Sequence, residues 1–244
     1  NEEAYRVVSE ALSLGYRAVD TAAGYQNEEG VGRAVRGSGA AREKIFLTSK
    51  LAAETKGYQE TLDAFEQTRA ALGVDYLDLY LIHAPWPWAD MGGDYSAQNI
   101  ASWRAMEELY RAGKVRAIGV SNFMPEHIKP LLDACEIVPH VNQISFYAGH
   151  IQRACCAYCE QHGIFVESYA PLATGAVFAQ PLVHTLAEKN GVTPAQLCIR
   201  YCLQKGHATI SKSVHRERLA ENAALSFTIP QEDMQALDAL DPEP

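Results

Sequence analysis

Short apolar segments that resemble strands alternate with amphipathic helical segments along this chain of 244 residues. Seven segments rich in Val, Ile, Leu and Tyr are predicted to be strands, at residues 17–21, 44–50, 77–83, 115–121, 140–146, 164–169 and 208–211. Helical periodicity fills the intervals, with Gly15, Gly73 and Gly113 as C-terminal stops and Pro125 and Pro194 in first helical turns. Strands that alternate with helices predict βα units and a parallel sheet.

The spacing of the strands favours one particular α/β architecture. The segments recur about every 32 residues, as in a (β/α)8 TIM barrel of roughly 250 residues. No linker, low-complexity tract or change of composition divides the chain, so we expect a single domain over residues 1–244. Only seven strands can be counted and the chain opens inside a helix, so we expect the first strand to be missing, at roughly 15 residues before Asn1.

Composition excludes several classes of partner. The chain has 21 Lys and Arg against 30 Asp and Glu, and this net charge of −9 argues against nucleic acid or an anionic membrane as the main partner. No apolar run approaches the roughly 18 residues of a membrane span. The six cysteines crowd together instead of spreading as a secreted disulfide framework would. We therefore expect a cytoplasmic protein with reduced thiols.

Polar side chains stand where the apolar strand segments end. In chain order these residues are Asp20, Lys50, His83, Ser121 with Asn122, Gln143, Tyr169, and Ser211 with Lys212. A barrel places its active site at the carboxyl ends of its strands, so these side chains are expected to converge on one mouth. Core packing would instead scatter polar residues along the strands.

Four of the residues near the first strand ends suit carbonyl chemistry. Tyr25 is a poor acid by itself at neutral pH, and a neighbouring ammonium group such as Lys50 makes a phenol a stronger one. Asp20 could hold Lys50 in place, and His83 could donate a hydrogen bond to a substrate oxygen. None of these groups can deliver a hydride, so a nicotinamide cofactor is implied.

Each of the four residues also has an ordinary structural interpretation when taken alone. Asp20 could cap a helix, Tyr25 could be a loop aromatic, Lys50 could lie on the surface, and His83 could be a hydrogen-bonded residue at the rim. Their joint placement at successive strand ends favours a site.

Several ordered motifs resemble those of one enzyme family. Residues 15–22 (GYRAVDTA), followed by Tyr25 and the Asn27-Glu28 pair, resemble the first signature of the aldo-keto reductases. Residues 45–50 (IFLTSK) and 78–83 (DLYLIH) are similar to the family's lysine and histidine strands. Residues 113–123 (GKVRAIGVSNF) and 210–213 (ISKS) resemble its second and third signatures. The resemblance runs from residue 1 to about 240.

The resemblance implies an NADPH-dependent reductase of aldehydes or ketones that is a monomer. By it, the catalytic residues are Asp20, Tyr25, Lys50 and His83, with Tyr25 as the proton donor. The cofactor-binding residues that it implies are Ser121, Asn122 and Gln143 for the carboxamide, Tyr169 for the ring, Leu172 and Thr174 for the pyrophosphate, Lys212, Ser213 and Arg218 for the 2′-phosphate, and Glu221 and Asn222 for the adenine. The family also begins with an N-terminal hairpin, which we expect to be missing here.

Some positions depart from the family pattern. Ala84 stands where the family usually carries a bulky aromatic residue, and we expect Trp86 and Trp88 to line the substrate site instead, together with Tyr25 and His83. Short bacterial-type members, such as 2,5-diketo-D-gluconate reductases, suggest a small carbonyl substrate by analogy alone.

Two other kinds of function remain open from the sequence. One is a non-catalytic cofactor-binding or structural protein on the same scaffold, including a protein that lost activity with the missing strand. The other is a metal-dependent barrel hydrolase. The remaining histidines lack metal-binding spacing, and cysteines four residues apart on a helix are more often packing residues, so we expect no metal.

Overall fold

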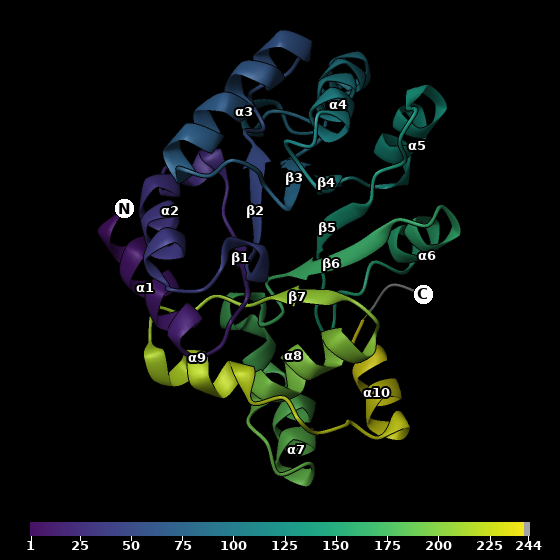
Figure 1. Cartoon of the computed structure of the whole chain (residues 1–244). Helices are drawn as coiled ribbons and strands as arrows, with labels where there is room; N and C mark the ends of the chain where they lie inside the picture. The colour runs from purple at the N-terminus through teal and green to yellow at the C-terminus, as the bar shows by residue number, and fades with distance from the viewer. Residues whose placement is uncertain (242–244) are drawn as a thin grey trace. The chain divides into compact units, whose positions relative to one another are not determined.

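The structure is a computed structural model that describes residues 1–241 (Figure 1). These residues belong to two compact units, Asn1–Asn142 and Gln143–Pro244, which are described in turn. No helix in residues 1–241 is both long enough and apolar enough to span a membrane.

The first unit alternates helices and strands in the predicted order. Its elements are α1 (Glu2–Ser13), β1 (Ala18–Asp20), η1 (Ala23–Tyr25), α2 (Glu28–Gly37), η2 (Arg42–Lys44), β2 (Phe46–Leu51), α3 (Tyr58–Leu72), β3 (Leu79–Ile82), η3 (Trp88–Asp90), α4 (Ser96–Arg111), β4 (Ile118–Ser121), α5 (Pro125–Ala134) and the start of β5 (Val141–Ser145). Strands β1 to β4 pair in sequence order, and all three pairs are parallel. The predicted βα alternation is therefore confirmed here.

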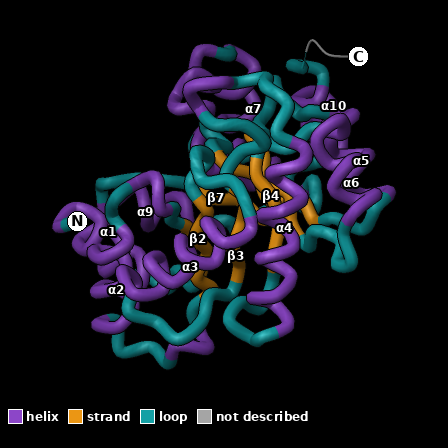
Figure 2. The backbone as a smooth tube through the Cα atoms, turned by 90° about the horizontal axis from the view of Figure 1, so that it is seen from above, coloured by secondary structure: helices purple, strands orange, loops and turns teal. Residues whose placement is uncertain are grey.

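Helices of the first unit follow from periodicity and from their end signals. Helix α3 buries Thr61, Phe65, Thr68 and Leu72 at helical spacing, and it ends at Gly73 with a φ of 63°. A left-handed residue at this position suits glycine, as the sequence predicts. Neighbouring helices pack side by side, α1 against α2, α2 against α3 and α3 against α4 (Figure 2).

Asp78 fixes the strands at the end opposite the predicted site. Its carboxylate is 1% exposed and accepts hydrogen bonds from Arg42 at 2.8 Å, Arg116 at 3.0 Å and the backbone N–H of Leu47 at 3.0 Å. Leu47 belongs to β2, and Asp78 directly precedes β3. A buried carboxylate needs such partners, and satisfying it sets the relative register of the two strands that carry Lys50 and His83.

The second unit contains the remaining predicted strands. Its elements are the rest of β5, α6 (Arg153–Gln161), β6 (Phe165–Tyr169), η4 (Ala173–Ala179), α7 (Pro181–Lys189), α8 (Pro194–Gln204), β7 (Ala208–Ile210), α9 (Arg216–Ala223) and α10 (Gln231–Asp238). Strands β6 and β7 are parallel. Thr193 caps α8, since its hydroxyl accepts from the Gln196 N–H at 3.2 Å while the Gln196 side chain accepts from the Thr193 N–H at 3.0 Å.

One strand-end prediction is wrong. Gln143 is the third of the five residues of β5, because Ile144 and Ser145 continue the strand beyond it. The cysteines of this unit pack as small apolar groups, and burial raises the pKa of Cys156 and of Cys198 to about 12. Among residues 1–241, no group of three or more His, Cys, Asp or Glu side chains could hold a metal ion.

Candidate active site

Asp20 and Tyr25 reach the site from the end of β1 and from the short helix that follows it. Asp20 is the last residue of β1, and Tyr25 closes the short 3₁₀ helix η1. The Tyr25 N–H donates to the Ala22 carbonyl at 3.0 Å, which closes the turn, and Gln26 then takes a left-handed conformation with a φ of 54°. This turn leaves the Tyr25 side chain half exposed, so its phenol can meet a ligand.

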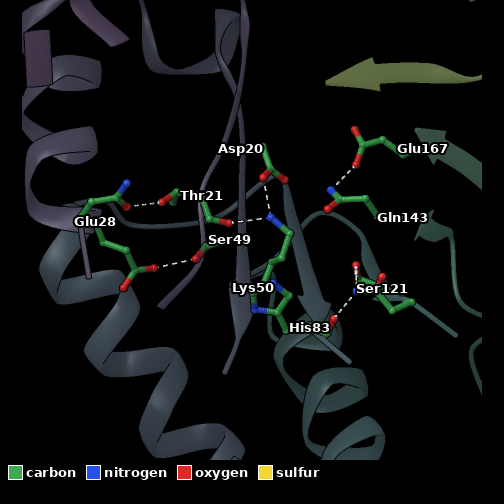
Figure 3. A network of polar contacts seen from close by, with 11 residues as sticks. Asp20, Thr21, Glu28, Ser49, Lys50, His83, Ser121, Gln143 and Glu167 are labelled. Carbon is green, nitrogen blue, oxygen red and sulfur yellow. Dashed lines mark hydrogen bonds and ion pairs between the residues drawn. The ribbon is translucent and has the colours of Figure 1, made fainter. Parts of the chain in front are cut away.

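Lys50 is the centre of the site and is almost completely buried. Its side chain stands near the end of β2 and is 1% exposed. The ammonium group donates to the Asp20 carboxylate and, at 3.0 Å, to the Thr21 carbonyl (Figure 3). A buried charge is tolerated only when it is paired and hydrogen-bonded, and these two acceptors supply both conditions.

Tyr25, Lys50 and His83 face one another. The Lys50 Nζ lies 5.2 Å from the centre of the Tyr25 ring, within the range of a cation–π contact. The Tyr25 and His83 rings meet edge to face, with their centres 5.6 Å apart and their planes at 79°. The structure thus brings the four predicted catalytic side chains together within the first unit.

His83 is a neutral imidazole at neutral pH. It follows β3 directly and is 9% exposed. Burial, and then the positive charge of Lys50, lower its pKa from 6.5 to about 4. Its Nδ1 atom is buried and has no hydrogen-bond partner among residues 1–241. A neutral imidazole carries one N–H group. His83 can therefore donate one hydrogen bond to a substrate oxygen without giving up a proton to it.

Stability is expected to fall as the pH drops from about 6.5 toward 4, and His83 contributes to this fall. Within this window the unfolded chain binds the proton that folded His83 refuses, so acid favours the unfolded state. His83→Gln should therefore flatten the slope of unfolding free energy against pH in urea titrations. Burial also lowers the pKa of His207 to about 4. His207 should therefore account for part of the dependence of unfolding free energy on pH that remains in His83→Gln. A slope that is the same in both proteins would contradict this.

A second polar network supports the catalytic strands, and sequence reasoning missed it. Glu28 is 8% exposed and accepts hydrogen bonds from Ser49 at 2.6 Å and Thr68 at 3.3 Å, while Thr21 donates to Asn27 at 2.7 Å (Figure 3). Burial raises the pKa of Glu28. Ser49 directly precedes Lys50, so Glu28 anchors the strand that carries the lysine. The Asn27-Glu28 pair was the available signal, but it carried no role by itself.

Two tryptophans form an aromatic wall beside His83. The rings of His83 and Trp88 meet edge to face at 5.6 Å, and those of Trp86 and Trp88 at 5.5 Å. Trp88 remains 43% exposed, whereas Ala84 is fully buried. The structure therefore places Trp86 and Trp88 together, with Trp88 against the imidazole. Their role toward a substrate remains a prediction.

Ser121 and Asn122 follow His83 in the first unit. Ser121 ends β4 and is 1% exposed, and Asn122 has a left-handed φ of 62°. The Asn122 amide donates to the His83 carbonyl at 2.9 Å and to the Ser121 hydroxyl at 3.1 Å. Asn tolerates this left-handed conformation better than most residues. The chain can therefore turn directly after β4, and the polar side chains of Ser121 and Asn122 lie side by side at the end of the strand.

In the second unit, the predicted cofactor residues near β5 and β6 stand next to a strained loop. The Gln143 amide donates to the Glu167 carboxylate at 2.8 Å, and Tyr169 ends β6 (Figure 3). After Tyr169 the chain takes left-handed conformations at Ala170, Ala173 and Thr174, with φ values of 52°, 47° and 54°. Such conformations cost energy outside glycine and concentrate at ligand-binding segments.

The predicted phosphate-binding residues lie beyond β7. Lys212 and Arg218 are exposed, and neither forms an ion pair within the described part of the chain. The Ser213 hydroxyl accepts from the His215 N–H at 3.1 Å at the start of α9. The Glu221 carboxylate accepts from the Thr193 hydroxyl at 2.6 Å, which ties α9 to the cap of α8, and Asn222 is buried.

The chain is similar to known proteins along its whole length. The sequence model of the Aldo/keto reductase family matches residues 1–242. The chain is 46% identical to the glyoxal reductase of Bacillus subtilis over 239 aligned residues. The alignment covers 98% of this chain and 83% of that protein.

Solved structures agree with this match. A crystal structure of an aldo/keto reductase from Brucella melitensis has a TM-score of 0.93 at 39% identity and covers 99% of this chain and 91% of that chain. A variant of Gox0644 in complex with NADPH has a TM-score of 0.90 at 42% identity and covers 99% and 85%. The predicted fold class, a (β/α)8 barrel, is confirmed by these likenesses. The chain therefore belongs to the aldo/keto reductase family, whose members are oxidoreductases that act on carbonyl groups.

Proposed function

We propose that this protein reduces an aldehyde or ketone to the alcohol with NADPH as the hydride donor. The observation that carries the proposal is the buried Lys50 ammonium group, held by Asp20 and the Thr21 carbonyl, with its Nζ 5.2 Å from the centre of the half-exposed Tyr25 ring. Burial of a cation costs desolvation energy. The position of this cation beside a phenol supports a role in stabilising the phenolate that forms when Tyr25 gives up its proton.

The four residues divide the acid chemistry between them. Tyr25 gives its phenolic proton to the substrate oxygen, and the resulting phenolate is stabilised by the ammonium group of Lys50. Asp20 holds that ammonium group in place. Neutral His83 donates a hydrogen bond to the substrate oxygen as negative charge develops there. NADPH, when bound, supplies the hydride that reaches the carbonyl carbon.

Residues of both units suit the parts of NADPH. In the first unit, the adjacent polar groups of Ser121 and Asn122 are proposed to hold the carboxamide. In the second unit, Gln143 is proposed as a further carboxamide ligand and Tyr169 as the residue that would contact the ring, while Leu172 and Thr174 would contact the pyrophosphate and Glu221 and Asn222 the adenine. Lys212, Ser213 and Arg218 are proposed to bind the 2′-phosphate. Lys212 and Arg218 form no ion pair with residues 1–241, so both cations are available to bind the dianionic 2′-phosphate. Such a local pair of cations is notable in a chain of net charge −9.

Removal of both cations is expected to weaken NADPH binding selectively. The double variant Lys212→Ala/Arg218→Ala should raise the Kd for NADPH by about 100-fold, since each charge-assisted hydrogen bond contributes about 1.5–3 kcal/mol. The Kd for NADH, which lacks the phosphate, should change by less than about threefold. Cofactor fluorescence titration measures both constants. Lys44→Ala/Arg104→Ala removes two exposed cations elsewhere as a control, and equal losses for both cofactors would contradict the assignment.

Small dicarbonyls are the substrates we propose to test first, because a relative of 46% identity is named glyoxal reductase. The experiment follows the loss of NADPH absorbance when the purified protein is mixed with glyoxal or methylglyoxal, and it identifies the alcohol by mass spectrometry. We expect stoichiometric conversion. No turnover with these or with a panel of simple aldehydes and ketones, although NADPH binds, would overturn the proposed activity.

The remaining parts of the proposal concern organisation and location. We propose a single barrel domain over residues 1–244 that acts as a monomer in the cytoplasm. None of the six cysteines, which all lie within residues 1–241, forms a disulfide, and this suits a reducing compartment. Sedimentation of the purified protein with and without NADPH tests the oligomeric state.

A further inference from the structure

A lysine that the proposed mechanism does not use lies next to the catalytic histidine strand. Lys56 follows β2, six residues after Lys50, and its ammonium group donates to the Ala84 carbonyl at 2.7 Å and to the Asn99 side-chain oxygen at 2.8 Å. Ala84 directly follows His83 and is fully buried. Lys56 therefore reaches across 28 residues of sequence to the backbone beside the imidazole.

Asn99 completes this contact from a third element. It lies in the first turn of α4, is 6% exposed, and its side-chain N–H donates to the Pro85 carbonyl at 2.7 Å. Lys56 and Asn99 together bind the two carbonyl groups that directly follow His83. We call this pair the Lys56–Asn99 clamp.

The ammonium group of Lys56 is buried in the clamp without a charged partner. Burial lowers the pKa of Lys56 to about 8, although the Glu54 carboxylate opposes this shift. The two hydrogen-bond acceptors of the ammonium group are a carbonyl and an amide oxygen, and neither carries a charge. Burial of an ammonium group beside uncharged acceptors carries a desolvation cost, and groups perturbed in this way concentrate at functional sites.

The segment that the clamp holds leads directly into the aromatic wall. Trp86 follows Pro85, and Trp88 contacts both Trp86 and His83 through ring edges. Trp88 is 43% exposed, so packing restrains this wall only in part. The bound carbonyl groups of Ala84 and Pro85 anchor the backbone directly before Trp86.

We propose that Lys56 is a positioning residue, which fixes the backbone at Ala84 and Pro85 and thereby holds Trp86 and Trp88 in place against His83 for the binding of the carbonyl substrate. This inference rests on the proposed carbonyl reduction. It assigns substrate affinity, not proton transfer, to the clamp.

The kinetic test uses Lys56→Met, which keeps the apolar stem of the side chain and removes its donors. We expect the KM for methylglyoxal to rise by about tenfold, since the charge-assisted hydrogen bond that anchors the Ala84 carbonyl is lost together with the one to Asn99, while kcat stays within about twofold. The Kd for NADPH should not change. Lys56→Arg, which restores a charged donor, should recover most of the affinity, and the exposed Lys44→Met is the matched control.

A second measurement does not depend on turnover. Acrylamide quenching of tryptophan fluorescence reports on Trp86 and Trp88, because the third tryptophan, Trp103, is 1% exposed. We expect the quenching constant to rise by about twofold in Lys56→Met, as expected for a loosened wall, with no change in Lys44→Met.

A double-mutant cycle tests whether the clamp acts as a unit. Lys56→Met/Asn99→Ala should raise KM little more than the larger single effect, because each change alone releases the same segment. Turnover by the unaltered protein with an unchanged KM and unchanged quenching in Lys56→Met would overturn the inference and leave the proposed function intact. Absence of turnover in the unaltered protein would overturn the proposed function, and the quenching data would still decide whether Lys56 holds the wall.

Discussion

Tyr25→Phe is expected to lower kcat/KM for carbonyl reduction by about 10³-fold, because a positioned general acid contributes roughly 10²–10⁴-fold to rate. The phenol is half exposed, and it lies edge to face with His83 and within 5.2 Å of the Lys50 ammonium group, measured from the ring centre. Phenylalanine preserves the ring and these aromatic contacts while removing only the proton donor. Steady-state NADPH oxidation with methylglyoxal measures the loss.

The control for Tyr25→Phe is cofactor binding. The Kd for NADPH and the melting temperature should stay close to those of the unaltered protein, because a half-exposed hydroxyl contributes little to folding. Tyr5→Phe, which removes an exposed phenol from α1, should leave turnover unchanged. A Tyr25→Phe protein that retains more than about one tenth of the activity would exclude Tyr25 as the proton donor.

Lys50→Met is expected to remove activity and also to destabilise the fold. The ammonium group is the cation beside Tyr25, so its loss leaves a phenolate without stabilisation and should lower kcat by about 10²-fold or more. The Asp20 carboxylate, with 12% of its side chain exposed, also loses its ionic partner. Breaking a buried pair from one side costs about 3 kcal/mol, which urea unfolding can measure.

The double variant separates the two effects of Lys50→Met. Asp20→Asn/Lys50→Met removes the uncompensated carboxylate, so we expect it to be more stable than Lys50→Met alone but equally inactive. If the double variant were less stable than the single one, the ion pair would not be the source of the lost stability. If Lys50→Met kept full turnover, the lysine would have no part in the acid chemistry.

The succession of strands and helices could be predicted because it depends on local patterns. Periodicity and end signals such as Gly73 and Thr193 lie within one turn of the helix that they terminate or start. The four proposed catalytic residues could also be predicted as a group, since Asp20, Lys50 and His83 lie at or next to the ends of consecutive strands. The position of Gln143 within its strand was not, because one polar residue in a short apolar run does not mark where pairing stops.

The interactions that support the site could not be predicted from the sequence. Three of these interactions involve charged residue types that ordinarily lie at the surface. They are the hydrogen bonds of Glu28 with Ser49, of Glu167 with Gln143 and of Lys56 with the Ala84 carbonyl. Nothing in their local sequence separates them from exposed residues such as Lys44. Each became informative only when its partner was known.

By itself, the sequence determined the βα alternation and the four side chains suited to protonating a carbonyl, because both are expressed in local patterns and in residue chemistry. The tertiary structure alone decided which buried groups are paired. Lys56 meets Ala84 and Asn99 across 28 and 43 residues at 2.7 and 2.8 Å. A hydrogen bond depends on such distances to a few tenths of an ångström, and only the packing of β2, β3 and α4 sets them.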